Sequence, residues 1–261
     1  MLRWLCPHAG AKSKGVADIG WLIDAPIASF IWEDPKMFPI QSRDNASIKG
    51  LQKCPALLNF ESQVVVVPCP FDLHLHIDFD PKSDKVQLTN VLGNQSPVNP
   101  TKIPEILSVT PRDRWRDPNR PVLQIMTPYR FLTDQNVYIN QLPPFMHYSS
   151  THWPGTLVCG RFPLNVWPRL LMWAFEWHDL KQDLILKRGE PWFYVRFECE
   201  DPSRMIRLVE AEATPELRAY CNGLDGVTNY VKQTFSLFKI AEKRRPKQLL
   251  KPKERNGTRS Q

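Results

Sequence analysis

A run of nine residues, 72–80, alternates strictly between ionisable and apolar side chains. In an extended strand successive side chains point to opposite faces, so this run would place two histidines and three carboxylates together, opposite an apolar face. His74 and His76 would then lie near enough for both imidazoles to bind one divalent metal ion, with Asp78 or Asp80 adding a carboxylate. The same pattern is also typical of an antiparallel strand whose polar face is simply solvated.

A narrower hypothesis treats His76 and Asp78 as a His-x-Asp pair, with His152 as a third metal ligand and Arg161 further along the chain. These four positions resemble the iron(II) site of the 2-oxoglutarate-dependent oxygenases. The resemblance implies a jelly-roll sheet that holds the metal, and an arginine that pairs with the far carboxylate of the cosubstrate. A cupin-like site, with Asp80 as the carboxylate beside the two strand histidines, is the alternative.

The loop over residues 143–153 is dense in prolines, hydroxyl groups and aromatic rings, and it contains His147 and His152. Such a loop can line a pocket. Its polar side chains can equally well satisfy nearby backbone groups, which is the commoner role of hydroxyl-rich loops. The sequence alone leaves these two interpretations open.

Positive charge is concentrated at the C-terminal end. The chain has 34 basic and 27 acidic residues, yet residues 243–261 hold eight of the basic residues against a single acid. We therefore expect a neutral body and a basic, disordered tail that starts at residue 243. The tail is a candidate surface for nucleic acid, an acidic protein partner or an anionic membrane. Its first candidate contacts are Lys243, Arg244, Arg245 and Lys247.

The cysteines and the apolar runs indicate the compartment. The six cysteines include no CxxC pair, and Cys159 and Cys199 lie in apolar surroundings, which is typical of reduced thiols. No run approaches eighteen consecutive apolar residues, and the first eight residues lack the apolar stretch of a secretory signal. We expect a soluble, cytoplasmic protein without a transmembrane segment.

Short strands dominate the predicted secondary structure, because 25 prolines end helices and are excluded from central strand positions. Apolar and alternating runs predict strands over residues 19–23, 27–32, 64–67, 72–80, 85–91, 122–131, 137–139, 156–162, 192–199 and 205–209. Residues 167–177 could form a helix opened by Pro168, but the alternation of their aromatic rings favours a strand. We expect one mainly β domain over residues 1–242, a sandwich or jelly-roll-like sheet. Residues 92–120 would form a long surface loop or an insertion.

One helix is predicted with a clear start signal. Thr214 provides a hydroxyl N-cap, Pro215 suits the first helical position, and Glu216 places an acid in the first turn. Apolar residues then recur at helical spacing as far as Phe238. We expect a single C-terminal helix, or one broken near Gly226, packed on the sheet.

Three patches of the sequence resemble a functionally uncharacterised family of bacterial and phage proteins that is prominent in cyanophages. The patches are residues 19–26 with Phe30 and Trp32, residues 123–131, and residues 189–192. The similarity spans most of residues 15–200. It implies a phage-associated protein in the host cytoplasm, and it supplies no reaction, cofactor or site residue.

A binding or assembly protein is the function that these patterns favour. A non-haem metal enzyme and nucleic-acid binding through the basic tail are the alternatives, whereas the lack of a glycine-rich phosphate loop argues against nucleotide-dependent phosphoryl transfer. A binding protein predicts aromatic surface near the proline-rich loops. The enzyme predicts that His74, His76 and a carboxylate converge in a pocket, with a third histidine nearby.

Overall fold

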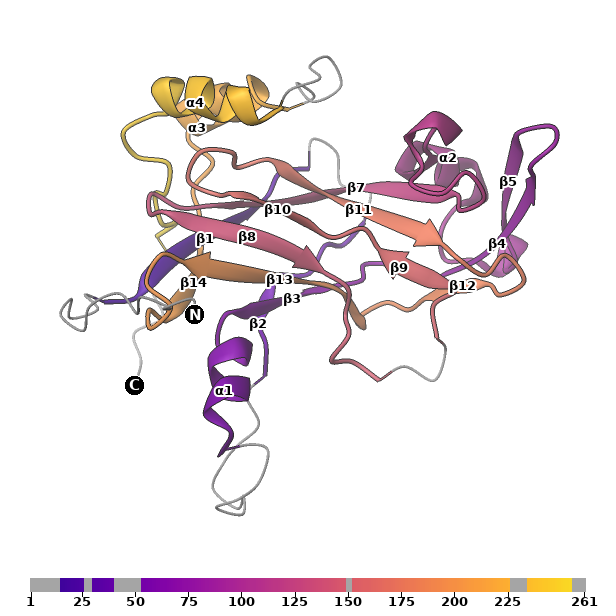
Figure 1. Ribbon diagram of the computed structural model, residues 1–261, viewed down its shortest axis with the longest axis horizontal. Coiled ribbons are helices and arrows are strands. Elements are labelled where there is room, and N and C mark those ends of the chain that lie inside the picture. Colours follow the sequence, from indigo (N-terminus) through magenta and orange to yellow (C-terminus); the bar gives the residue numbers. More distant parts are fainter. Residues whose placement is uncertain (1–14, 26–29, 40–52, 149–151, 226–233, 255–261) are drawn as a thin grey trace, which may run out of the picture.

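The computed structural model describes residues 15–25, 30–39, 53–148, 152–225 and 234–254, and it is mainly β (Figure 1). The strands are β1 (Ala17–Ile23), β2 (Lys36–Met37), β3 (Val64–Pro68), β4 (Leu73–Asp80), β5 (Lys85–Asn90), β6 (Leu107–Val109), β7 (Val122–Leu132), β8 (Val137–Leu142), β9 (Gly155–Leu157), β10 (Gly160–Pro163), β11 (Leu170–Trp177), β12 (Leu184–Leu186), β13 (Pro191–Cys199) and β14 (Ile206–Glu210). The helices are α1 (Pro55–Glu61), α2 (Ile103–Ile106), α3 (Pro215–Asn222) and α4 (Thr234–Arg244). The expected mainly β fold with a helix near the C-terminal end is confirmed.

Two larger sheets contain most of the strands. The first has the order β14-β1-β7-β11-β9, with β6 paired to β7, and the second has the order β10-β8-β13-β3-β2. A smaller sheet has the order β12-β4-β5. Neighbouring strands are antiparallel, except that β1 and β14 run parallel.

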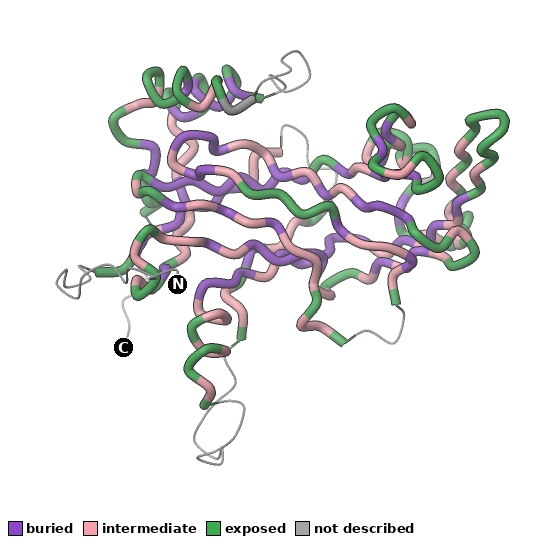
Figure 2. The backbone as a smooth tube through the Cα atoms, in the orientation of Figure 1, coloured by how far each residue is buried: buried purple, intermediate pink, exposed green. Residues whose placement is uncertain are grey.

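The two larger sheets face each other across a core of aromatic rings. The ring centroids of Phe131 on β7 and Phe197 on β13 lie 5.5 Å apart, and those of Trp173 on β11 and Trp192 on β13 lie 5.6 Å apart. All four side chains are buried. Large rings fill the space between sheets efficiently, so this contact makes the molecule sandwich-like. In Figure 2 buried residues, in purple, recur along the strands of both sheets.

Strand β4 alternates as its sequence predicts. Leu73, Leu75 and Ile77 are buried, whereas the intervening histidines are partly exposed and Asp78 is exposed. β4 pairs antiparallel with β5 in a hairpin, and Asp84 in the turn has a positive φ of 58°. The polar residues of the run therefore share one outer face, as the alternating pattern requires.

Residues 92–120 are not a plain surface loop. They contain short 3₁₀ turns, α2 and the strand β6, which pairs with β7. Leu107 is buried, and the buried Trp115 packs edge-on against Phe79 at 5.3 Å and donates its indole N–H to the carbonyl of Thr110 at 2.8 Å. The segment is attached to the sheet because these apolar side chains contact it.

Two predicted strands differ in the structure. The predicted strand over residues 156–162 divides into β9, which pairs with β11, and β10, which pairs with β8, so the chain passes from one large sheet to the other. Residues 27–29 lie outside the described residues, and residues 30–32 are not a strand. There Trp32 packs edge-on against Tyr129 at 5.8 Å instead.

The predicted helix begins as expected. The side chain of Thr214 accepts a hydrogen bond from the backbone N–H of Leu217, which is the N-cap interaction, and Pro215 occupies the first turn. α3 ends at Asn222 and α4 begins at Thr234. The predicted break near Gly226 falls outside the described residues. Within the ranges that the structure describes, no helix is long and apolar enough to cross a membrane.

The fold extends past the predicted boundary at residue 242, which corrects that expectation for residues 243–254. Both carboxylate oxygens of Asp134 accept backbone hydrogen bonds, one from Leu249 at 2.7 Å and one from Leu250 at 3.1 Å. Leu249 is only 1% exposed, and Pro252 forms a bridge with Ala211. The sequence analysis missed this because the segment is basic and proline-rich, although its Leu249 and Leu250 are buried in a local core.

Candidate functional site

Asp183 joins the two histidines of β4. Its Oδ2 lies 2.7 Å from Nε2 of His74, and its Oδ1 lies 2.7 Å from Nδ1 of His76. Asp183 immediately precedes β12, whose Ile185 pairs with His74 across the sheet. The strand register therefore brings a carboxylate from far along the chain onto the polar face of β4.

The hydrogen bonds shift the pKa values of His76 and Asp183. The pKa of His76 is raised, mainly because its ring donates a hydrogen bond to Asp183, and the nearby charge of Asp78 adds to the effect. The pKa of Asp183 is lowered, first because of the hydrogen bond from His76 and then because of the one from His74. All three side chains are partly exposed, so solvent screens the interaction. We call His74, His76 and Asp183 the His–Asp cluster.

The His–Asp cluster does not fit a metal centre. Each imidazole nitrogen that faces Asp183 lies within hydrogen-bond distance of a different carboxylate oxygen, which leaves both oxygens occupied. Asp78 is 70% exposed and its Oδ1 lies 3.5 Å from Nε2 of His76, whereas Asp80 accepts hydrogen bonds within its own turn. Among the described residues no group of three His, Cys, Asp or Glu side chains is placed to hold a metal ion.

His152 lies in a different setting, at a cavity of about 240 Å³. The cavity is lined by Pro143, Pro144, Phe145, His147, Tyr148, His152, Trp153, Gly155, Glu190 and Pro191. Tyr148 is 84% exposed and Phe145 is 58% exposed, and the rings of Tyr148 and His152 meet edge-on at 6.5 Å. We call this space the loop cavity, because most of its walls come from residues 143–153.

Core contacts hold the rings of the loop cavity. Trp153 packs edge-on against the buried Phe175 at 6.0 Å and donates its indole N–H to the carbonyl of Ile185 at 3.2 Å. Phe145 meets the buried Tyr194 edge-on at 5.8 Å. These aromatic walls are therefore fixed in orientation before any ligand arrives.

The loop cavity and the His–Asp cluster share one segment of chain. Gln182 donates a side-chain hydrogen bond to the carbonyl of His152, and its neighbour Asp183 contacts the β4 histidines. The structure thus brings the backbone of His152 to the same segment as Asp183. The ring of His152 contacts Tyr148 rather than a metal-ligand group.

Arg161 lies on β10, which is an edge strand of a different sheet from β4. Its Nε donates to Glu198 at 3.0 Å, and its guanidinium stacks over the ring of Tyr138 at 3.7 Å. The carboxylate that Arg161 binds is therefore a side chain of this protein. This position corrects the expectation that Arg161 would serve the predicted metal site.

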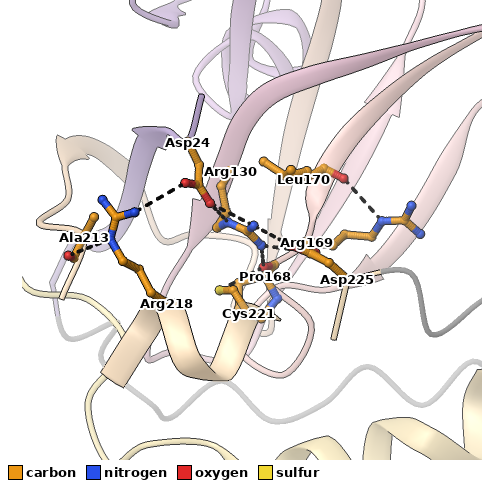
Figure 3. A network of polar contacts seen from close by, with 9 residues as sticks. All are labelled: Asp24, Arg130, Pro168, Arg169, Leu170, Ala213, Arg218, Cys221 and Asp225. Atoms are coloured by element: carbon orange, nitrogen blue, oxygen red, sulfur yellow. Dashed lines mark hydrogen bonds and ion pairs between the residues drawn. The ribbon is translucent and has the colours of Figure 1, made fainter. Parts of the chain in front are cut away.

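Sequence reasoning missed a buried arginine, which Figure 3 shows at the centre of a polar network. Arg130 on β7 is only 1% exposed, and its Nη2 donates to Asp225 at 2.8 Å and to Asp24 at 3.0 Å. Its Nη1 donates to the carbonyl of Pro168 at 2.6 Å. The sequence contained one signal of this burial, because Arg130 lies inside the otherwise apolar run of residues 128–132. The network ties the segment after α3 to β7, which is a structural role.

The predicted tail contacts divide into two groups. Arg245 pairs with Asp134 at 2.7 Å. Lys243, Arg244 and Lys247 are exposed and form no ion pair with the part of the chain that the structure describes. These three cations lie in the last turn of α4 or just after it, and they remain available to a partner.

Comparison with known proteins adds no assignment. No model of a known protein family matches the chain, and no curated protein matches its sequence. The resemblance of residues 15–200 to a family of bacterial and phage proteins therefore stays a prediction. Function has to be inferred from the site, because a β-sandwich-like fold supports many functions.

Proposed function

We propose that this chain is a binding protein, that the loop cavity is its ligand site, and that the ligand presents a sugar ring. The observation that carries the proposal is the exposure of Tyr148 and Phe145 at the rim of a cavity whose floor is fixed by the core. Large aromatic side chains left in solvent beside a cavity are typical of binding surfaces.

The chemistry around the loop cavity suits a polyhydroxylated ring. Nε2 of His147 and Oε2 of Glu190 lie 3.9 Å apart in its lining and both side chains are partly exposed, and His152 adds a second imidazole. Imidazoles and a carboxylate together can donate to and accept from neighbouring hydroxyl groups. Exposed aromatic rings cover the apolar face of a sugar by stacking, as they do for nucleic-acid bases.

The size of the cavity limits what enters it. Sites for drug-sized ligands measure about 300–1,000 Å³, so a cavity of about 240 Å³ accommodates one ring of a larger ligand. A polyproline peptide suits it less well, because the indole N–H of Trp153 already donates to Ile185 and is not free to bind a peptide carbonyl.

Binding to a panel of methyl glycosides and oligosaccharides, measured by NMR chemical-shift perturbation, tests the proposal. We expect shifts at Trp153 and His152, and a loss of affinity of about tenfold in Tyr148→Ala, because one stacking contact contributes about 1–3 kcal/mol. Met126→Ala is the matched control, since Met126 is also exposed but lies on β7, outside the loop cavity. A panel without any binder, or binding that persists unchanged in Tyr148→Ala, would reject the sugar site.

A further inference from the structure

A second cavity lies between α3 and α4, which run side by side at one end of the strands (Figure 1). Its volume is about 680 Å³, within the range of about 300–1,000 Å³ typical of small-molecule sites. It is lined by Trp167, Glu216, Ala219, Tyr220, Gly223, Leu224, Leu237, Ile240, Ala241, Arg244 and Pro246. We call it the helix groove.

The helix groove is a formed feature of the fold. The hydroxyl oxygen of Tyr220 on α3 lies 3.0 Å from the carbonyl of Ala241 on α4 and 2.7 Å from that of Val166. Trp167 is buried in the floor and packs edge-on against Phe238 at 5.2 Å. These contacts hold the two helices against the sheet while leaving space between them.

The walls of the helix groove are apolar and partly uncovered. Ile240 is 47% exposed and Leu237 is only partly buried, although both line the same groove as the buried Leu224. Covering exposed aliphatic surface is favourable by about 25 cal/mol per Å². A ligand with an apolar chain would therefore be stabilised in this groove.

Positive charge borders the helix groove. Arg244 lines it, and Lys243 and Lys247 lie close by in the chain; none of the three pairs with an acid in the described ranges. The acid in the lining is Glu216, in the first turn of α3. A helix C-terminus is itself partly negative, which favours cations here but does not neutralise three of them.

We propose that the helix groove binds a single-chain fatty acid, with its hydrocarbon chain along Leu237 and Ile240 and its carboxylate on Arg244. The apolar surface of the groove matches the hydrocarbon chain. The guanidinium of Arg244, which forms no ion pair with the described residues, matches the anionic head by a charge-assisted hydrogen bond. This site is separate from the loop cavity and does not depend on the sugar proposal.

Nucleic acid fits the helix groove less well. Binding of single strands depends on exposed aromatic faces on which bases stack. Two aromatic rings line this groove, those of Trp167 and Tyr220, and they are only 3% and 9% exposed, so neither offers a free face for a base. The uncovered surface is aliphatic, which favours a hydrocarbon chain.

Isothermal titration calorimetry with dodecanoate, below its micelle concentration, tests the proposal on the full chain. We expect binding of dodecanoate, and at least tenfold weaker binding of dodecyltrimethylammonium, which has a similar chain and the opposite charge. Arg244→Gln should weaken dodecanoate binding about fivefold to tenfold. Lys243→Gln is the matched control, because it removes one positive charge from the adjacent residue, which does not line the groove.

Ile240→Asp tests the apolar wall, and its thermal melt shows whether it is folded. We expect it to stay folded, because Ile240 is half exposed, and to bind dodecanoate at least tenfold more weakly. Equal affinity for dodecanoate and dodecyltrimethylammonium would overturn the proposal. Equal losses of dodecanoate affinity in Arg244→Gln and Lys243→Gln would also overturn it. Binding of a single-stranded oligonucleotide or of anionic lipid vesicles, reduced equally in both charge variants and unaffected by dodecanoate, would assign the cations to that ligand instead.

Discussion

Oδ1 of Asp183 and Nδ1 of His76 lie 2.7 Å apart although 107 residues separate them in the chain. The contact arises because β12 pairs with β4, and it converts a row of polar side chains on one strand into an ionic cluster that joins two strands. The imidazole donates and the carboxylate accepts, so each partner stabilises the charged form of the other.

The first prediction concerns the pKa of His76, which should exceed the usual value of 6.5 in an NMR titration. Asp183→Asn should lower it toward that value, because the replacement removes the main hydrogen-bonded charge. Asp78→Asn should lower it less, since Asp78 is largely exposed. A pKa of His76 that is insensitive to Asp183→Asn would show that the contact does not form in solution.

The same cluster makes stability depend on pH in a defined direction. The raised pKa of His76 gives stabilisation that is present below pH 6.5 and is lost as pH rises through the folded value. The lowered pKa of Asp183 gives stabilisation that is present above pH 3.8 and is lost as pH falls through the folded value. Denaturant unfolding should therefore show a larger difference between wild type and Asp183→Asn near pH 5.5 than near pH 8.

Arg130 should contribute strongly to stability. Arg130→Ala leaves Asp24 and Asp225 without their shared cation and opens a buried space, so we expect a loss of about 3–5 kcal/mol in denaturant unfolding. Arg207→Ala is the control, because Arg207 also pairs with an aspartate, Asp18, but is exposed. Similar losses in both variants would contradict a special role for the buried network.

The C-terminal segment should be required for full stability. Leu249→Ala is expected to destabilise the protein by about 2–5 kcal/mol, because it removes a buried side chain and leaves a cavity. Lys247→Ala, two residues away and exposed, should leave the thermal melt nearly unchanged. Truncation after Glu242 should lower the melting temperature markedly. An unchanged melting temperature would show that the segment is an appended tail and not part of the fold.

Gly155 should not tolerate a larger side chain. A Cβ atom at this position would overlap the backbone carbonyl of Glu176 on the neighbouring strand β11. Gly155→Ala should therefore cost about 1–3 kcal/mol and disturb the loop cavity, as for other overpacked sites. Gly160→Ala offers a close control, because nothing lies within 4 Å of its added Cβ. The comparison requires only the two thermal melts and sugar binding by NMR.

Local patterns were sufficient for the elements themselves. The alternation of β4 determined which of its side chains are buried, because the side-chain period of a strand is two residues. The N-cap at Thr214 was readable because a capping hydroxyl, a proline and an acid act within a single turn. In each case the residues that decide the structure lie next to one another in the chain.

Composition misled where burial depends on partners elsewhere. Leu249 and Leu250 lie among lysines and prolines, and their burial follows from Asp134, which binds their backbone N–H groups. The resemblance to the oxygenases grouped Arg161 with the strand histidines, whereas the sheet order puts it on β10, beside Glu198. Spacing along the chain does not determine which sheet a strand joins.

The sequence by itself thus determined the β-rich class, the two-faced strand with His74 and His76, and the start of the C-terminal helix. Only the tertiary structure decided that Asp183 meets those histidines, that Arg130 is buried between two aspartates, and that aromatic rings from the 143–153 loop surround a cavity. The physical reason is the separation along the chain of the residues that interact. Alternation and capping act over a few residues, whereas ion pairs and cavities depend on strand pairing between distant segments.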